Sequence, residues 1–172
     1  FYYKGMCSAF FERTDEAELY YKRCIELGDD NQKVMANYTL AMLYARHHTV
    51  GKSLDVSEKC LQDAYQILTK NDSSTEIPNQ VFKKVFNRNG YALILFRRGG
   101  VDEAIEILQM GIKKLESVEE QDQKLHRSVL IYNLAQCYKQ KGFLDEAIQT
   151  YQKLLEIDPL FPEYHIELAK CL

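Results

Sequence analysis

The sequence predicts an all-α protein built from antiparallel helix hairpins, and residues 128–161 carry the clearest signal. Apolar residues recur there at helical spacing in two runs, from Ile131 to Tyr138 and from Leu144 to Leu155. Gly142 lies between the runs, where a tight turn needs a residue that can adopt a positive φ. Because neither helix can bury its apolar stripe alone, each must pack on the other and on a neighbouring pair. The same rhythm recurs along the chain and predicts several hairpins.

The composition is that of a soluble globular protein, with 46% hydrophobic residues, 27% charged residues and a formal net charge of −3. A mild negative charge argues against general nucleic-acid binding, which calls for a strongly basic face. No apolar run approaches the roughly 18 residues of a membrane span, and no signal peptide is recognisable. We therefore expect a cytoplasmic protein with neither nucleic acid nor membrane as a partner. The chain opens without methionine and ends inside a helical pattern, so we expect a fragment of a longer protein.

Four helix pairs and a terminal helix are expected in chain order. Their predicted spans are 1–30, 31–72, 78–118, 123–161 and 162–172. Thr14 is expected to cap the second helix, with Asp15 and Glu16 in its first turn. The second helix of the second pair is expected to run long, through Leu68. Loops are expected at 47–51 and at the polar segment 71–78, and an acidic connection at 116–123.

The five cysteines do not form a CxxC pair, and their spacing follows helix packing. Cys7, Cys137 and Cys171 fall on the small-residue position of first helices. Cys24 and Cys60 fall on the corresponding position of second helices. We expect all five to be reduced residues that fill close helix contacts.

The stretch 128–161 also has large and small residues in a characteristic order. These residues are Leu134, Ala135, Tyr138, Gly142, Ala147, Tyr151, Leu154 and Pro159. In this order the stretch resembles a tetratricopeptide repeat (TPR), with Ile131 where that repeat often has tryptophan. The resemblance implies a right-handed α-solenoid of antiparallel helix hairpins, a TPR-like superhelix that forms a single domain over 1–172.

No catalytic motif is recognisable in the sequence. His47, His48, His126 and His165 stand neither in a HExxH motif nor at metal spacing from a cysteine. The paired acidic residues fall at helix starts, where they complement the helix dipole. We therefore expect no catalytic residue, no metal, no cofactor and no enzyme activity.

The resemblance places the first helix of each pair on a concave inner surface, where side chains beside the packing stripe line a groove. The predicted lining is Tyr2, Met6, Met35, Tyr38, Met42, Arg46, Phe86, Asn89, Leu93, Arg97, Val129, Tyr132, Gln136 and Lys139. Aromatic and methionine side chains on a rigid surface suit a peptide or helical ligand. Arg46 and Arg97 occupy the same position on successive first helices and are expected to hold a ligand carboxylate.

Repeats of this family that bind chaperone tails use a clamp of Lys and Asn residues on the first three first helices. Tyr2, Met6, Thr39, Phe86 and Gly90 stand at those places, so the clamp is absent. The sequence thus favours a non-catalytic protein–protein interaction module, a scaffold that binds a peptide or helical segment of a partner protein in its groove. Two alternatives remain open: a peptide-sensing regulatory domain of a larger protein, and a structural solenoid segment that self-associates through its ends.

Overall fold

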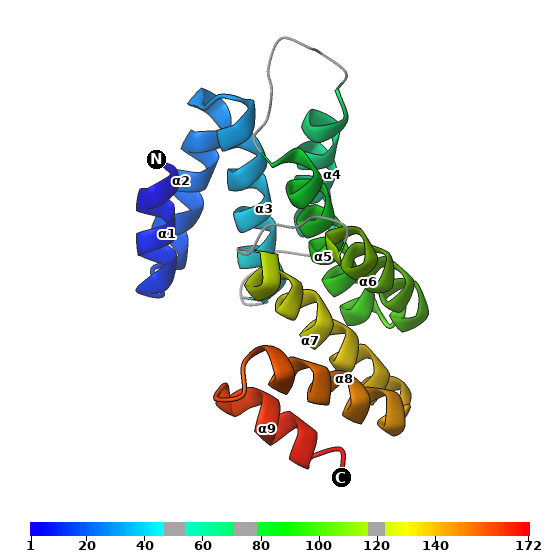
Figure 1. Cartoon of the computed structure of the whole chain (residues 1–172). Coiled ribbons are helices and arrows are strands. Elements are labelled where there is room, and N and C mark those ends of the chain that lie inside the picture. Colours follow the sequence, from blue (N-terminus) through cyan, green and yellow to red (C-terminus); the bar gives the residue numbers. More distant parts are fainter. Residues whose placement is uncertain (47–53, 71–78, 117–122) are drawn as a thin grey trace. The chain divides into compact units, whose positions relative to one another are not determined.

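The computed structural model of the chain describes residues 1–46, 54–70, 79–116 and 123–172, with side chains from 126 onward in the last range. Within these ranges the chain forms nine helices and no strand (Figure 1). The helices are α1 (Tyr2–Phe10), α2 (Thr14–Leu27), α3 (Asp30–Arg46), α4 (Leu54–Thr69), α5 (Gln80–Arg98), α6 (Val101–Glu116), α7 (Gln123–Lys141), α8 (Leu144–Ile157) and α9 (Pro162–Ala169). They pack as sequence-adjacent pairs, which confirms the all-α solenoid class.

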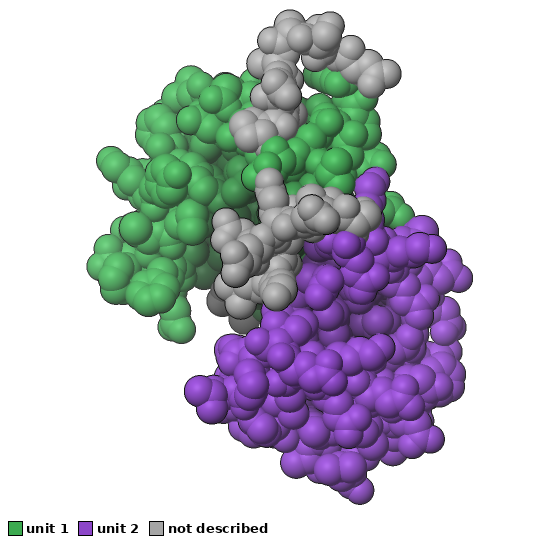
Figure 2. Space-filling view, viewed as in Figure 1, with its two compact units in different colours: residues 1–94 green, residues 95–172 purple. Residues whose placement is uncertain are grey.

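The chain divides into two compact units, unit 1 from Phe1 to Ile94 and unit 2 from Leu95 to Leu172 (Figure 2). Unit 1 contains α1 to α4 and most of α5, and unit 2 contains the last turn of α5 and α6 to α9. The single domain over 1–172 and the right-handed superhelix stay predictions.

The core of unit 1 is built around α3, which packs on α1, α2 and α4. All residues from Leu40 to Ala45 are buried, so α3 is covered on every side at that level. Two buried polar side chains join neighbouring helices. Ser57 Oγ on α4 donates to the Ala41 carbonyl at 2.7 Å, and Asn87 Nδ2 on α5 donates to the Leu61 carbonyl at 3.0 Å. These bonds satisfy polar groups that would otherwise be costly to bury.

The core of unit 2 is formed by the two apolar stripes that the sequence predicts for α7 and α8. Ala135, Ala147, Tyr151 and Leu154 are fully buried there. Tyr164 on α9 packs against the same cluster, so α9 covers the end of this hairpin. Helix α9 spans Pro162–Ala169, within the range 162–172 predicted for a terminal helix.

The turn between α7 and α8 has the predicted geometry. Gly142 has φ +78, and the Phe143 amide bonds the Tyr138 carbonyl at 3.0 Å. The turn between α5 and α6 repeats this arrangement, with φ +87 at Gly99. Both turns use a residue without a Cβ in the left-handed region, where other residues are strained.

Some details of the predicted elements differ in the structure. Thr14 is the first helical residue of α2 rather than its cap, and no side chain caps this helix. Asp15 and Glu16 do stand in its first turn, as expected. Helix α4 extends through Leu68, but its 16 residues equal those of α6, so it is not unusually long. The predicted loops at 47–51 and 71–78, and the connection at 117–122, lie outside the described residues.

The cysteines follow the packing prediction at four of five positions. Cys24, Cys60, Cys137 and Cys171 are buried, and burial raises the pKa of the Cys60 and Cys137 thiols to about 11. Cys7 is exposed, so the prediction is wrong there. The buried side of α1 is formed by other residues, Gly5 and Ser8, which leaves Cys7 on the open side.

Candidate functional site

A cavity of about 410 Å³ opens in unit 1, where the start of α1, the end of α2, the start of α3 and the first turns of α5 come together. Its wall is largely apolar and aromatic, with a polar edge formed by α3 and α5. The side chains that line it include Tyr2, Tyr3, Leu27, Met35, Asn31 and Lys83. Two of the predicted groove residues, Tyr2 and Met35, therefore belong to one cavity.

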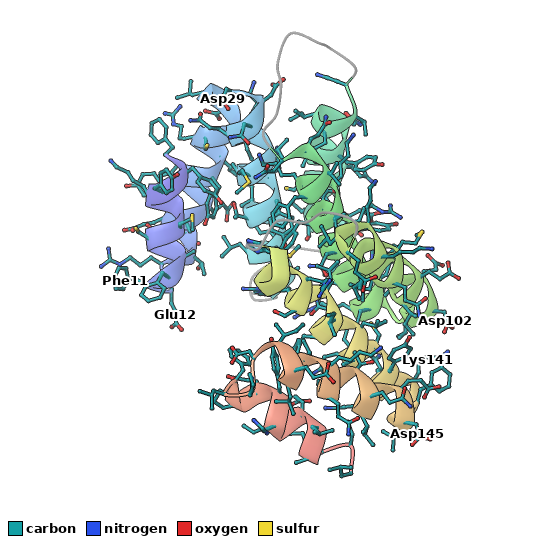
Figure 3. The ribbon with its side chains drawn as sticks, in the orientation of Figure 1. Phe11, Glu12, Asp29, Asp102, Lys141 and Asp145 are labelled. Carbon is teal, nitrogen blue, oxygen red and sulfur yellow. The ribbon has the colours of Figure 1, made fainter. Side chains whose placement is uncertain are left out.

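Lys83 forms the polar edge of this cavity. Its Nζ donates to Asn31 Oδ1 at 2.6 Å, which joins α5 to α3. Burial lowers the pKa of the Lys83 ammonium, while the nearby Asp29 carboxylate acts in the opposite direction. Asp29 lies at the junction of α2 and α3 (Figure 3), and its Oδ1 accepts a hydrogen bond from the Gln32 backbone N–H at 2.8 Å. Among the described residues that line the cavity, Lys83 is the only one with a charged side chain.

An aromatic set, defined as Tyr38, Phe82 and Phe86, lies beside the cavity on α3 and α5. The ring centroids of Tyr38 and Phe86 are 6.1 Å apart, and those of Phe82 and Phe86 are 4.5 Å apart. All three side chains are half-buried. Tyr38 follows Met35 by three residues and Phe86 follows Lys83 by three, so each pair shares a helix face. The aromatic set thus continues the wall of the cavity along both helices.

The remaining predicted residues of unit 1 lie in different surroundings. Met6 and Arg46 are exposed, and Leu93 packs partly against the core. Met42 and Asn89 are only 9% and 5% exposed, so they belong to the interior rather than to a binding surface. The cause is the dense packing around α3, which places the Met42 methyl group against Gly90 and the Asn89 side chain against Tyr38.

In unit 2, the predicted residues of α7 contact α9. Tyr132 lies between the rings of Tyr151 and Tyr164, with centroids 6.2 and 5.9 Å away. Gln136 Nε2 donates to Glu167 at 3.2 Å, and Lys139 forms an ion pair with the same carboxylate. The groups predicted to meet a ligand therefore hold a carboxylate of the chain itself.

Two of the predicted residues, Val129 and Arg97, remain to be placed. Val129 is 42% exposed, and Arg97 is exposed at the end of α5. Arg97 belongs to unit 2 and Arg46 to unit 1, so their joint role in holding a carboxylate stays a prediction.

Sequence reasoning missed Asn31, Phe82 and Lys83. Phe82 could have been found, because it lies four residues before Phe86 and shares its helix face. Asn31 and Lys83 are 52 residues apart, and no local pattern connects them.

The part of the chain that the structure describes contains no group of three or more His, Cys, Asp or Glu side chains that could hold a metal ion. None of its helices is both long enough and apolar enough to cross a membrane. His47 and His48 lie outside the described residues, and the His165 ring contacts the Pro159 carbonyl at 2.7 Å.

Comparison with known proteins gives one family match. Residues 132–172, which include the second half of α7 and all of α8 and α9, match the family model described as TPR repeat. No curated protein matches the chain.

Proposed function

We propose that this chain, a TPR-like helical repeat protein, is a non-catalytic interaction module that holds a peptide or helical segment of a partner on unit 1. Repeats of this family mediate protein–protein interaction in general and are typically not catalytic. The proposed surface consists of the cavity and the adjoining aromatic set, on α1, α3 and α5. The observation that supports it most is that the cavity and the aromatic set both use residues of α3 and α5, the first helices of successive pairs.

The chemistry of this surface suits a partner segment. Aromatic and methionine side chains offer a large contact area at a low cost in side-chain entropy. Buried aromatic anchors also dominate the energetics of many interfaces. Tyr38 and Phe86 are already ordered by their mutual contact, so binding needs little further ordering.

The test is a Tyr38→Ala, Phe86→Ala double variant, compared with wild type in quantitative capture of partner proteins from a lysate of the source cells. We expect the captured amount of the partner to fall about ten-fold or more, because each truncated anchor costs about 1–2 kcal/mol of binding. Tyr65→Ala is the matched control, since Tyr65 is 41% exposed on α4, outside the proposed surface. Circular dichroism before capture verifies that each variant is folded. Undiminished capture by a folded double variant would contradict the proposal.

Self-association is a second candidate, supported by exposed aromatic side chains at the end of α1. Phe10 and Phe11 are 82% and 65% exposed, and their rings contact each other at 5.3 Å between centroids. Sedimentation velocity over a range of concentrations distinguishes the candidates. A chain that binds only through the proposed surface remains monomeric, whereas a self-associating chain sediments faster with concentration and loses this behaviour in a Phe10→Ser, Phe11→Ser variant.

A further inference from the structure

Unit 1 has another cavity, between α4 and α5, which lie side by side (Figure 1). The two helices meet where the buried Asn87 side chain donates to the Leu61 carbonyl at 3.0 Å. A Cβ at Gly90 would lie 3.1 Å from a Leu61 methyl group, so the backbone of α5 approaches α4 closely there. Beside this contact, longer side chains flank a space of about 370 Å³. Such a volume lies at the lower end of the range of about 300–1,000 Å³ that small organic ligands occupy.

This cavity is separate from the surface proposed above. Arg88, which lines it, follows Phe86 by two residues, and side chains at that spacing do not share a helix face. The α4 wall is formed by four residues that belong neither to the first cavity nor to the aromatic set: Leu61, Gln62, Tyr65 and Gln66. A ligand bound here therefore leaves the proposed surface free.

Arg88 supplies the charge of this cavity. Its guanidinium carbon lies 5.5 Å from the centroid of the Tyr91 ring, which itself packs against the core of unit 1. This stacking restricts the Arg88 side chain and leaves its N–H groups available as donors. Over the described part of the chain no carboxylate forms an ion pair with Arg88, and α5 contains no acidic residue. Glu58 accepts a hydrogen bond from Gln62 Nε2 at 3.4 Å and is not part of the cavity wall.

The α4 wall is suited to a flat organic group. Tyr65 is 41% exposed, so part of its ring surface is accessible from the cavity. Aromatic rings favour offset or edge contacts with a second ring. Gln62 and Gln66 lie one turn apart on α4, and their amides add further N–H donors. The cavity thus combines an aromatic surface with a positively charged, donor-rich side.

We propose that this cavity binds an aromatic carboxylate, whose carboxylate receives N–H bonds from the Arg88 guanidinium while its ring lies against Tyr65. The planar guanidinium matches the two oxygens of a carboxylate, and such charge-assisted bonds are stronger than neutral ones. A free aromatic acid and the terminal aromatic residue of a protein chain both offer this chemistry. The inference does not depend on the proposed function, because it concerns a different face of unit 1.

The experiment titrates the whole chain with phenylacetate and follows the backbone amide signals by two-dimensional NMR. Phenylacetamide lacks the charge of this probe, and acetate lacks its ring. We expect phenylacetate to saturate the signals of α4 and α5 beside the cavity, and both analogues to bind at least about ten-fold more weakly. A glycine–serine peptide that ends in a free phenylalanine distinguishes the two sources. Tighter binding of the peptide than of phenylacetate assigns the ligand to a protein chain end, and the reverse order assigns it to a free acid.

Arg88→Gln is expected to weaken phenylacetate binding about ten-fold or more, since the charge-assisted bonds are lost. Tyr65→Ala is expected to weaken it about three-fold, because the ring contact is removed. Arg23→Gln is the matched control: it removes the same group from an exposed position on α2 and is expected to change affinity less than about two-fold. The amide spectrum of each variant verifies that it is folded.

Each other outcome overturns a distinct part of the reasoning. Equal affinity for phenylacetamide overturns the role of the carboxylate, and equal affinity for acetate overturns that of the ring. Phenylacetate that binds Arg88→Gln as tightly as wild type overturns the assignment to this cavity. Absence of saturation by phenylacetate and by the peptide at millimolar concentration overturns the proposal as a whole. The capture experiment on Tyr38 and Phe86 is unaffected by any of these results.

Discussion

Replacing Glu167 by glutamine removes one negative charge from the contact between α9 and α7 with little change of shape. The Glu167 side chain is only 12% exposed, and its carboxylate receives hydrogen bonds from Lys139, Lys170 and Gln136. The Lys139 ammonium first, and then that of Lys170, lowers the pKa of this carboxyl from the ordinary 4.5 to about 2, although burial acts in the opposite direction.

The sign of the effect follows from that shift. A carboxyl whose pKa is lowered in the folded state stabilises the fold fully at pH values above its pKa in the unfolded state. This stabilisation is lost as the pH falls through the pKa of the folded state. A shift from 4.5 to about 2 corresponds to at most about 3 kcal/mol at pH 7 and about 1 kcal/mol at pH 3. Solvent screening reduces both values, because Lys139 and Lys170 are 31% and 56% exposed. We expect Glu167→Gln to lower the free energy of unfolding by about 1–3 kcal/mol at pH 7.

The assay is urea unfolding followed by circular dichroism at pH 7, 5, 4 and 3, for wild type, Glu167→Gln and Glu163→Gln. Glu163 is an exposed residue of the same helix, so its substitution is expected to cost about 0.5 kcal/mol or less. The difference between wild type and Glu167→Gln should shrink by more than half between pH 7 and pH 3. A difference that does not vary with pH, or an equal loss in Glu163→Gln, would refute the reasoning.

Three further predictions concern the cores and the cysteines. Gly5→Ala should lower the free energy of unfolding by about 1 kcal/mol, because an added Cβ would lie 2.6 Å from the buried Tyr21 ring. This overpacking outweighs the gain in helix propensity. A rise in the urea midpoint would contradict the prediction. Tyr151→Phe should leave stability unchanged or raise it by up to about 1 kcal/mol, since within the described residues its buried hydroxyl has no hydrogen-bond partner. Thermal unfolding tests this prediction, and a clear loss of stability would oppose it. Ellman's reagent should label one thiol rapidly in the native protein, that of Cys7, and the four buried thiols only after unfolding; a Cys7→Ser variant that keeps the rapid phase would disprove the assignment.

The helices and their pairing could be read from the sequence because their signals are local. The stripe that contains Ala147, Tyr151 and Leu154 follows the helical period, and these residues are fully buried as that period predicts. Gly142 marks its turn through a backbone property that glycine alone adopts without strain.

The proposed surface was harder to predict, because it depends on how distant helices meet. The helical period separates an inner from an outer face, but α3 is buried on all sides at Met42, so no face remains open there. The bond between Lys83 and Asn31 depends on the register of α5 against α3, which no local pattern specifies. The ion pair of Lys139 with Glu167 likewise depends on how α9 packs on the last hairpin, which no local pattern specifies.

The glycine turns at Gly99 and Gly142 bear on how such a chain can change through evolution. In both, main-chain hydrogen bonds and one left-handed glycine close the hairpin. The local path of the chain therefore depends little on which side chains the outward faces of the helices carry. Exposed positions on these helices can accumulate substitutions, and so acquire a different partner, while the hairpins that support them persist.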